Sequence, residues 1–167
     1  MAGSYNGYFS LTPLEERLFA LLLEAANNTQ TVVRIAGGWA RDKLLNLNSD
    51  DIDVALDNVT GEVFAHAVKQ VLIKHDISSG SIAIIAANPE QSKHLETATM
   101  RVLDLEVDFV NLRAETYSSD SRIPTSTFGS ALEDAYRRDF TINAIFYNLN
   151  EGKVEDFTSM FRISNFE

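Results

Sequence analysis

Apolar residues recur at two spacings along the chain, and together the spacings predict strands interleaved with helices. Near the N-terminus the spacing is helical: Thr12 would cap the helix before Pro13, and the apolar stripe is formed by Leu14, Leu18, Leu21, Leu22 and Ala25. Runs of apolar and β-branched residues predict strands near Val32–Ala36, Asp51–Leu56, Ser81–Ala87 and Leu103–Asn111. Helical patterns near Trp39–Leu45 and Thr60–His75 separate these strands, so we expect an α/β (α+β) domain.

Two further segments complete this outline. Ser130 and Glu133 have the spacing of a capping box, which predicts a helix that begins near Ala131 and continues through Arg137–Tyr147. The segment Asn88–Thr99 is polar, contains a proline and is long enough to form a mobile loop between two strands.

Two carboxylates mark the start of one predicted strand. Because residues i and i+2 of a strand point to the same face, Asp51 and Asp53 should point one way while Ile52 and Val54 pack the other way. Like charges on one face repel unless a cation lies between them, and Mg²⁺ prefers carboxylate and phosphate oxygens. Two such ions about 3.5–4 Å apart could activate a hydroxyl and stabilise a leaving pyrophosphate. A solvated strand end is the alternative interpretation of so short a motif.

A glycine turn precedes this motif. Gly37 and Gly38 follow one predicted strand and precede a predicted helix, and such turns leave backbone N–H groups free to face an anion. Arg41, early in that helix, could add a charged donor for phosphate oxygens. Many tight turns use glycine for backbone reasons alone. The chain contains neither a GxGxxG fingerprint nor a GxxxxGK-S/T P-loop.

A third carboxylate could complete such a site. Strand alternation puts Asp104, Glu106 and Asp108 on one face of the segment that follows Leu103. Asp108 is the most embedded in apolar sequence, so it is the best candidate for a functional carboxylate. A solvated strand face is the alternative for Asp104 and Glu106.

The last polar constellation lies in the predicted C-terminal helix. There Asp139 and Asn143 would be i and i+4 neighbours within increasingly apolar sequence. Buried polar groups need partners, which ribose hydroxyls or the edge of a base could supply. A surface pair of arginine and Asp139 on the polar face of the helix is the alternative.

Taken together, these segments resemble the tRNA nucleotidyltransferases that add CCA to tRNA 3′ ends, a class that shares its head domain with bacterial poly(A) polymerases. Six segments carry the resemblance in the family's order: GGWARD (Gly37–Asp42), DDIDVA (Asp50–Ala55), NPEQSKHLETAT (Asn88–Thr99), LEVDFVNLR (Leu105–Arg113), SRIPTSTFG (Ser121–Gly129) and RRDFTINAIFYN (Arg137–Asn148). SKHLETAT and VDFVNLR look like eukaryotic members in particular. The resemblance implies the nucleotidyltransferase (polymerase-β-like) head fold, a mixed sheet backed by helices.

The resemblance also implies residue roles. Asp51 and Asp53 would bind catalytic Mg²⁺, as two ions, and Asp108 matches the position of a third acidic residue. Contacts to the nucleotide would come from two groups of residues, Gly37, Gly38, Arg41 and Asp42 in the first and Arg137, Arg138, Asp139 and Asn143 in the second. The tRNA 3′ hydroxyl would then attack the α-phosphate of CTP or ATP and release pyrophosphate.

The end of the chain departs from the family pattern. Family members continue past the segment that matches Val154–Thr158 into a motif that reads the incoming base, then into neck, body and tail regions that grip tRNA. We therefore expect an N-terminal helical segment at 1–30, a head domain at 31–158 and a divergent tail at 159–167, without the other regions. Because 24 acidic against 14 basic residues give a net charge of −10, such a head should hold the tRNA 3′ end weakly.

Composition bears on the size of the domain, on its metal sites and on its cellular location. A chain of 167 residues with 45% hydrophobic content is long enough for one packed domain, and the absence of cysteine excludes disulfides and thiolate metal sites. No apolar stretch has transmembrane length, and the N-terminus lacks a secretory or arginine-rich targeting pattern. We expect an intracellular, cytoplasmic protein with no membrane partner; the nucleus or an organelle stays as an alternative, and the oligomeric state is open.

Two hypotheses about function follow. In the first, the chain is a nucleotidyltransferase head that binds CTP or ATP with Mg²⁺ and extends a tRNA 3′ end. In the second, the same fold is a catalytically silent nucleotide-binding or interaction module.

Overall fold

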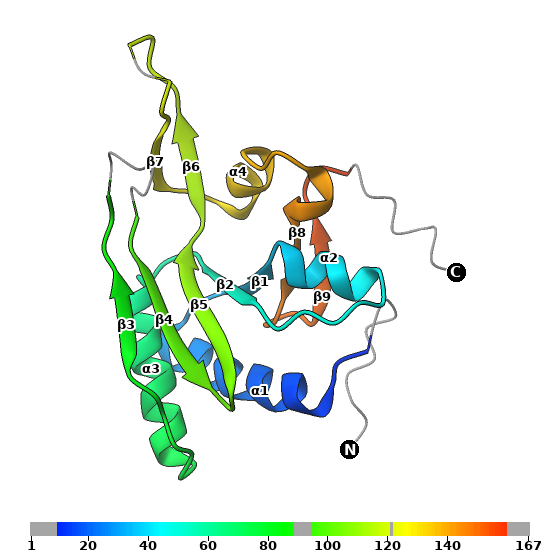
Figure 1. Ribbon diagram of the computed structural model, residues 1–167, viewed down its shortest axis with the longest axis vertical. Helices are drawn as coiled ribbons and strands as arrows, with labels where there is room; N and C mark the ends of the chain where they lie inside the picture. The colour runs from blue at the N-terminus through cyan, green and yellow to red at the C-terminus, as the bar shows by residue number, and fades with distance from the viewer. Residues whose placement is uncertain (1–9, 89–94, 121, 160–167) are drawn as a thin grey trace.

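A computed structural model describes residues 10–88, 95–120 and 122–159, and it contains a large mixed sheet with helices packed against it (Figure 1). The sheet has seven strands, in the order β3 (Ile82–Ile85), β4 (Thr97–Val102), β5 (Leu105–Asn111), β2 (Ile52–Leu56), β1 (Val33–Ala36), β8 (Ile145–Asn148) and β9 (Lys153–Asp156). Strands β2 and β5 are parallel, and the other neighbours are antiparallel. The expected mixed sheet backed by helices is confirmed.

The remaining elements surround this sheet. They are the helices α1 (Pro13–Thr29), α2 (Gly38–Leu44), α3 (Gly61–Lys74) and α4 (Ala131–Tyr136), a 3-10 turn η2 (Thr141–Ala144), and a separate hairpin of β6 (Arg113–Thr116) and β7 (Thr125–Phe128). The hairpin projects away from the large sheet (Figure 1). In the described part of the chain, no helix combines the length and apolar character needed to cross a bilayer.

Helices α1, α3 and α4 begin where a side chain replaces missing backbone hydrogen bonds. Thr12 and Ser130 cap α1 and α4 in complete capping boxes with Glu15 and Glu133, and Thr60 caps α3 by accepting from a backbone N–H. The predicted N-terminal stripe then packs into the core, because Leu18, Leu21, Leu22 and Ala25 are buried. Leu14 differs from the expectation, since it remains 41% exposed at the first turn.

Helix α1 is joined to α2 by a buried polar contact. The indole N–H of Trp39 donates to Glu15 Oε1 at 2.9 Å, and Lys43 Nζ lies 2.7 Å from Glu15 Oε2. Trp39 also packs against the rings of Phe19 and Tyr147, which contact each other. Helix α2, which follows the glycine turn, is therefore held against α1 and β8 by buried contacts.

The prediction of a helix that continues through Arg137–Tyr147 is wrong beyond Tyr136. Helix α4 ends there, Phe140 has extended backbone, and Ile145–Asn148 forms β8, which is buried throughout and pairs with β1. A run of isoleucine, phenylalanine and tyrosine fits a buried strand at least as well as a helix. Pairing with β1 decides between the two because it satisfies the backbone groups of both strands.

The predicted loop Asn88–Thr99 is also shorter than expected. Strand β4 begins at Thr97, and residues 89–94 lie outside the described residues. The strand expected from Leu103 begins at Leu105, because Leu103 and Asp104 form the turn between β4 and β5 with φ values of 50° and 66°. Asp104 is therefore a turn residue and not part of the carboxylate face of β5.

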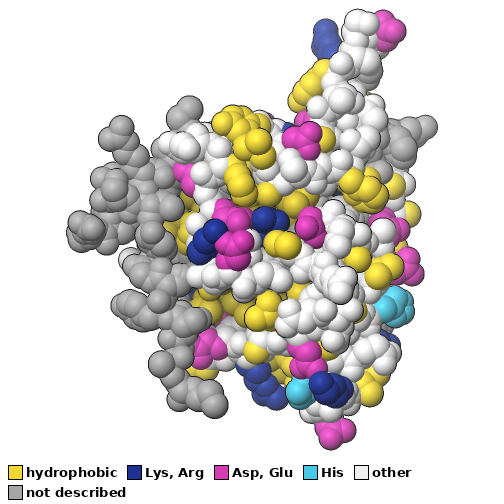
Figure 2. Space-filling view, turned by 180° about the vertical axis from the view of Figure 1, so that it is seen from behind, with side chains coloured by type: hydrophobic (Ala, Val, Ile, Leu, Met, Phe, Trp, Pro, Cys, Tyr) yellow, Lys and Arg dark blue, Asp and Glu magenta, His cyan; other side chains and the backbone are white. Residues whose placement is uncertain are grey.

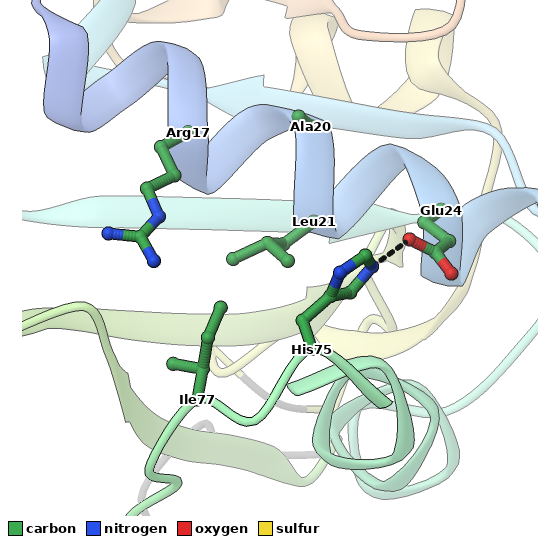
Figure 3. Close-up of a pocket in the computed structure, with 6 residues that line it drawn as sticks. All are labelled: Arg17, Ala20, Leu21, Glu24, His75 and Ile77. Atoms are coloured by element: carbon green, nitrogen blue, oxygen red, sulfur yellow. Dashed lines mark hydrogen bonds and ion pairs between the residues drawn. The ribbon is translucent and has the colours of Figure 1, made fainter. Parts of the chain in front are cut away.

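A cavity of about 300 Å³ lies beside α1 and the segment after α3 (Figure 3). Arg17, Leu21 and Glu24 reach it from α1, and His75 and Ile77 reach it from the other side. Glu24 lies within 2.7 Å of His75 Nε2 and 2.6 Å of Lys74 Nζ. The cavity contains none of the predicted site residues.

Candidate functional site

The predicted carboxylates meet where two parallel strands run side by side. The register of β2 and β5 places Asp53 directly beside Asp108. Asp51 and Asp53 are exposed while Ile52 and Val54 are buried, as the alternation predicted. Two segments that are far apart in the sequence thus bring three carboxylates to one region of the sheet.

This arrangement disfavours the ionised form of Asp53. Although solvent still reaches the Asp53 side chain, the surrounding protein removes part of the solvent around its carboxyl. This partial loss of solvent, and then the negative charge of Asp108, raise the pKa above the ordinary value of 3.8, while the charge of Arg138 acts in the opposite direction. Asp108 is half-buried, and its Oδ1 accepts a hydrogen bond of 2.5 Å from Thr99 Oγ1 on β4. That contact fixes the orientation of Asp108 beside Asp53.

The donor set fits a hard cation only in part. Across residues 10–88, 95–120 and 122–159, no group of three or more His, Cys, Asp or Glu side chains is arranged to enclose a metal ion. Mg²⁺, however, commonly takes one or two carboxylates and completes its shell with waters and substrate phosphates. Adjacent carboxylates that repel one another have the chemistry of such an open site.

The glycine turn lies against the C-terminal motif. Gly37 has a φ of 61°, and a Cβ at this position would lie 3.2 Å from Arg138 Nη1. Arg138 Nη1 also donates to the backbone oxygen of Asn143, while Arg41 Nη1 donates to Asn143 Oδ1 at 2.9 Å. Asn143 therefore joins the two groups of predicted nucleotide-binding residues.

The other predicted residues of these groups occupy different positions. Asp42 Oδ1 accepts from Arg41 Nε at 2.7 Å, so it holds the arginine and is less available to a ligand. Asp139 is exposed and follows the end of α4. Asp139 and Asn143 are not neighbours on a helix, because the chain changes from α4 to a 3-10 turn between them.

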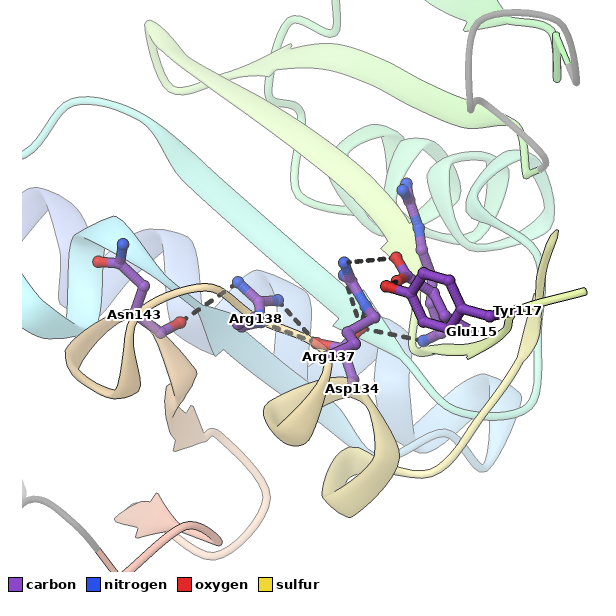
Figure 4. Close-up of polar contacts among 7 residues, drawn as sticks. Glu115, Tyr117, Asp134, Arg137, Arg138 and Asn143 are labelled. Carbon is purple, nitrogen blue, oxygen red and sulfur yellow. Dashed lines mark hydrogen bonds and ion pairs between the residues drawn. The ribbon is translucent and has the colours of Figure 1, made fainter. Parts of the chain in front are cut away.

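Sequence reasoning missed Asp134, which lies at the centre of the arginine cluster, the group formed by Arg113, Arg137 and Arg138. This carboxylate is 1% exposed and accepts hydrogen bonds from Arg137 Nε, from Nε and Nη2 of Arg138, and from the backbone N–H of Arg113 (Figure 4). The available signal was the spacing of the two arginines from Asp134, at i+3 and i+4 near the end of a helix that Ser130 caps.

Arg113 is a second residue that was missed. Its Nε is buried and has no hydrogen-bond partner among the described residues. Loss of solvent, and then the charge of Arg137, lower the pKa of its guanidinium. Its positive charge also acts on Asp53. The carboxylates therefore face arginines supplied by β6 and by the end of α4.

Comparison with known proteins identifies the family of the chain. A family model described as the Poly A polymerase head domain matches residues 33–162. The mitochondrial CCA tRNA nucleotidyltransferase of Candida glabrata is 54% identical over 130 residues, which make up 75% of this chain and 24% of that protein. The expected likeness to eukaryotic members is confirmed.

Solved structures give the same result for the fold. The apo form II of a CCA-adding enzyme aligns with a TM-score of 0.72 and 28% identity over 88% of this chain and 32% of that one. A CCA-adding enzyme in complex with CTP aligns with a TM-score of 0.67 and 25% identity over 93% of this chain and 33% of that one. The chain thus spans about a quarter to a third of these three proteins.

Proposed function

Because the chain belongs to the Poly A polymerase head domain family, we propose that it is the catalytic head of a nucleotidyltransferase that transfers CMP or AMP from CTP or ATP to a tRNA 3′ hydroxyl. The observation that carries the proposal is the register of β2 and β5, which sets Asp53 beside Asp108 and within electrostatic reach of Arg138. The similarity to a CCA tRNA nucleotidyltransferase and to a CTP complex supports the choice of substrates.

Asp51 and Asp53 are the proposed ligands of Mg²⁺, bound as two ions. When bound, the metal would lower the pKa of the attacking hydroxyl and neutralise charge on the leaving pyrophosphate. The raised pKa of Asp53 supports this role, because a carboxylate that repels its neighbour gains most from a cation. Asp108, oriented by Thr99, would accept the proton of the attacking hydroxyl.

The nucleotide would lie between the glycine turn and the arginine cluster. Gly37 and Gly38 allow close approach of the triphosphate, and Arg41 and Arg138 supply charged donors that Asn143 joins. Asp42 would keep Arg41 in place, Arg137 would support Arg138 through Asp134, and Asp139 would accept from a ribose hydroxyl. The new bond forms between the 3′ oxygen and the α-phosphorus as the bond to pyrophosphate breaks.

Contacts with tRNA are proposed to be weak in this chain. The net charge is −10, and on the face drawn in Figure 2 the Lys and Arg side chains lie among Asp and Glu side chains, without a broad basic patch over the described residues. An intracellular location is proposed, and the mitochondrial name of the Candida glabrata relative makes an organelle as good a candidate as the cytoplasm.

The test is incorporation of labelled CTP or ATP into tRNA that lacks its CCA end, in the presence of Mg²⁺. We expect incorporation by the wild-type chain and its loss in Asp53→Asn, which removes one negative charge with little change of shape. Asp104→Asn is the matched control, because Asp104 is fully solvated in the turn between β4 and β5. Tight, Mg²⁺-dependent binding of CTP without any incorporation would instead support the silent nucleotide-binding module.

A further inference from the structure

A second cavity, of about 360 Å³, opens between the end of β6 and α4, next to the arginine cluster. Tyr117, just after β6, and Tyr136, the last residue of α4, line it from two different elements. The two residues are 72% and 66% exposed. Most of their aromatic surface is therefore available to a ligand.

The polar groups of this cavity are already paired with protein. Glu115 Oε2 accepts from Tyr117 Oη at 3.1 Å, and Glu115 Oε1 lies 3.7 Å from Arg137 Nη1. Glu133 accepts from the N–H and the hydroxyl of Ser130. The cavity consequently offers a ligand aromatic surface more than unoccupied donors or acceptors.

The cavity is connected to the proposed active site by one array of side chains (Figure 4). Asn143 and Arg138 form one end, Glu115 and Tyr117 form the other, and Arg137 lies between them. The pKa of Tyr117 is raised, first by its hydrogen bond to Glu115 and by the charge of that residue, and then by loss of solvent and the charge of Asp139. The Tyr117 hydroxyl therefore stays neutral and donates to Glu115.

We propose that the cavity between Tyr117 and Tyr136 stacks an unpaired nucleobase of the RNA strand whose 3′ end is extended, an inference that rests on the proposed function. Aromatic side chains stack on any base, since every base has a π-face. An end that grows by successive additions presents a new terminal base after each step, which favours stacking over hydrogen-bond readout. The incoming nucleotide is the weaker candidate, because its triphosphate is assigned to Gly37 at the opposite end of the array.

The charge of the chain supports the same occupant. A protein with a net charge of −10 gains little from contacts to RNA phosphates, and such contacts weaken further with salt. Stacking does not depend on counterion release, so two exposed rings can contribute affinity where the electrostatics cannot.

The experiment titrates a short single-stranded RNA that carries 2-aminopurine at its 3′ end, whose emission falls when the base is stacked. Tyr117→Leu and Tyr136→Leu remove one ring each and should weaken binding roughly 5- to 150-fold, which corresponds to loss of one stacked base. Tyr117→Phe keeps the ring and should restore binding. Phe128→Leu is the matched control, because Phe128 is 60% exposed on β7 and does not line the cavity.

Each outcome decides the proposal. Wild-type RNA affinity in both leucine variants, or no quenching by the wild-type chain, overturns it. A loss of CTP binding larger than the loss of RNA binding assigns the cavity to the incoming nucleotide and overturns it as well. Mg²⁺-dependent binding of CTP to the wild-type chain is measured separately: if it is absent while ring-dependent quenching persists, the proposed function fails and the stacking site stands.

Discussion

Asp53 on β2 and Asp108 on β5 are register partners in a parallel pair of strands, so their carboxylates lie side by side at the candidate site. Loss of solvent and the charge of Asp108 together raise the pKa of Asp53. The fold therefore holds two like charges in a position that favours a cation or a proton. Groups with such shifts concentrate at functional sites, where they lower the stability of the unliganded protein.

The first prediction concerns stability and pH. A raised pKa means that the folded state binds a proton at Asp53 more tightly than the unfolded state, for which the value is near 3.8. Below that value Asp53 is protonated in both states and has no effect on stability; the cost grows as pH rises from 3.8 toward the folded pKa, and it stays constant above the folded pKa. Asp53→Asn should thus raise the metal-free Tm at neutral pH by roughly 1–3 °C, after allowance for solvent screening.

Thermal unfolding in EDTA at neutral and acidic pH measures this effect. The gain in Tm should shrink as pH falls toward 3.8, whereas Asp104→Asn should leave Tm unchanged at each pH. Added Mg²⁺ should raise the Tm of the wild-type protein but not that of Asp53→Asn. Equal melting temperatures for wild type and Asp53→Asn at neutral pH would contradict the assigned electrostatics.

The second prediction concerns Asp134. This carboxylate is buried and pairs with Arg137 and Arg138, so Asp134→Asn leaves two guanidinium groups without their anionic partner. Breaking a buried pair on one side costs about 3–5 kcal/mol, and partial exposure of both arginines places the expected loss at or below the lower end of that range. Urea unfolding measures the loss, and calorimetry should show weaker CTP binding.

Glu133→Gln provides the control for Asp134. Glu133 is the exposed neighbour on the same helix and belongs to the capping box of α4. Its replacement should cost about 1 kcal/mol or less and should not change CTP binding. Equal effects of the two variants on CTP binding would show that Asp134 acts through the helix and not through Arg138.

The sequence predicted those elements that depend on local chemistry. The caps at Thr12 and Ser130 and the alternation around Asp53 depend on residues within one turn or one strand, and the structure confirms them. The sequence did not predict that α4 ends at Tyr136. The segment Ile145–Asn148 is apolar enough for either a helix or a strand, and only its pairing with β1, more than a hundred residues away, makes it a strand.

In the candidate site, too, individual residues were predicted but their long-range contacts were not. Asp53 and Asp108 were identified separately, but their proximity follows from the register of β2 and β5, which no local pattern encodes. Asn143 was expected to neighbour Asp139 on one helix, whereas in the structure it accepts from Arg41, which precedes it by 102 residues. Asp134 was missed because a buried carboxylate on an amphipathic helix looks like a solvated one until its arginine partners are placed.

The third prediction tests a close approach between α3 and the sheet. Gly61 begins α3, and a Cβ there would lie 2.4 Å from the backbone oxygen of Phe109, beside Asp108. Backbone cannot move aside as a side chain can, so Gly61→Ala should destabilise the protein by about 1–3 kcal/mol or more. Gly80→Ala is the control, because its Cβ would make only ordinary contacts with Arg101. Denaturant unfolding that gives equal stabilities for both variants would contradict the packing.

The last prediction concerns the contact between Arg41 and Asn143. The 2.9 Å hydrogen bond joins the glycine turn to the C-terminal motif, and Arg41 is otherwise held by Asp42. If Asn143 serves to orient Arg41 toward the triphosphate, Asn143→Ala should weaken CTP binding by about 1.5–3 kcal/mol, the range for a hydrogen bond to a charged group. Arg41→Ala should weaken CTP binding at least as much, and the double variant should bind CTP no more weakly than Arg41→Ala alone, because the two residues then act as one unit.

Arg101→Ala removes an exposed arginine that lies 3.9 Å from Asp104, and it controls for the loss of positive charge. Additive losses in the double variant would mean that Asn143 and Arg41 contact the nucleotide independently, and the assigned orienting role of Asn143 would then be wrong.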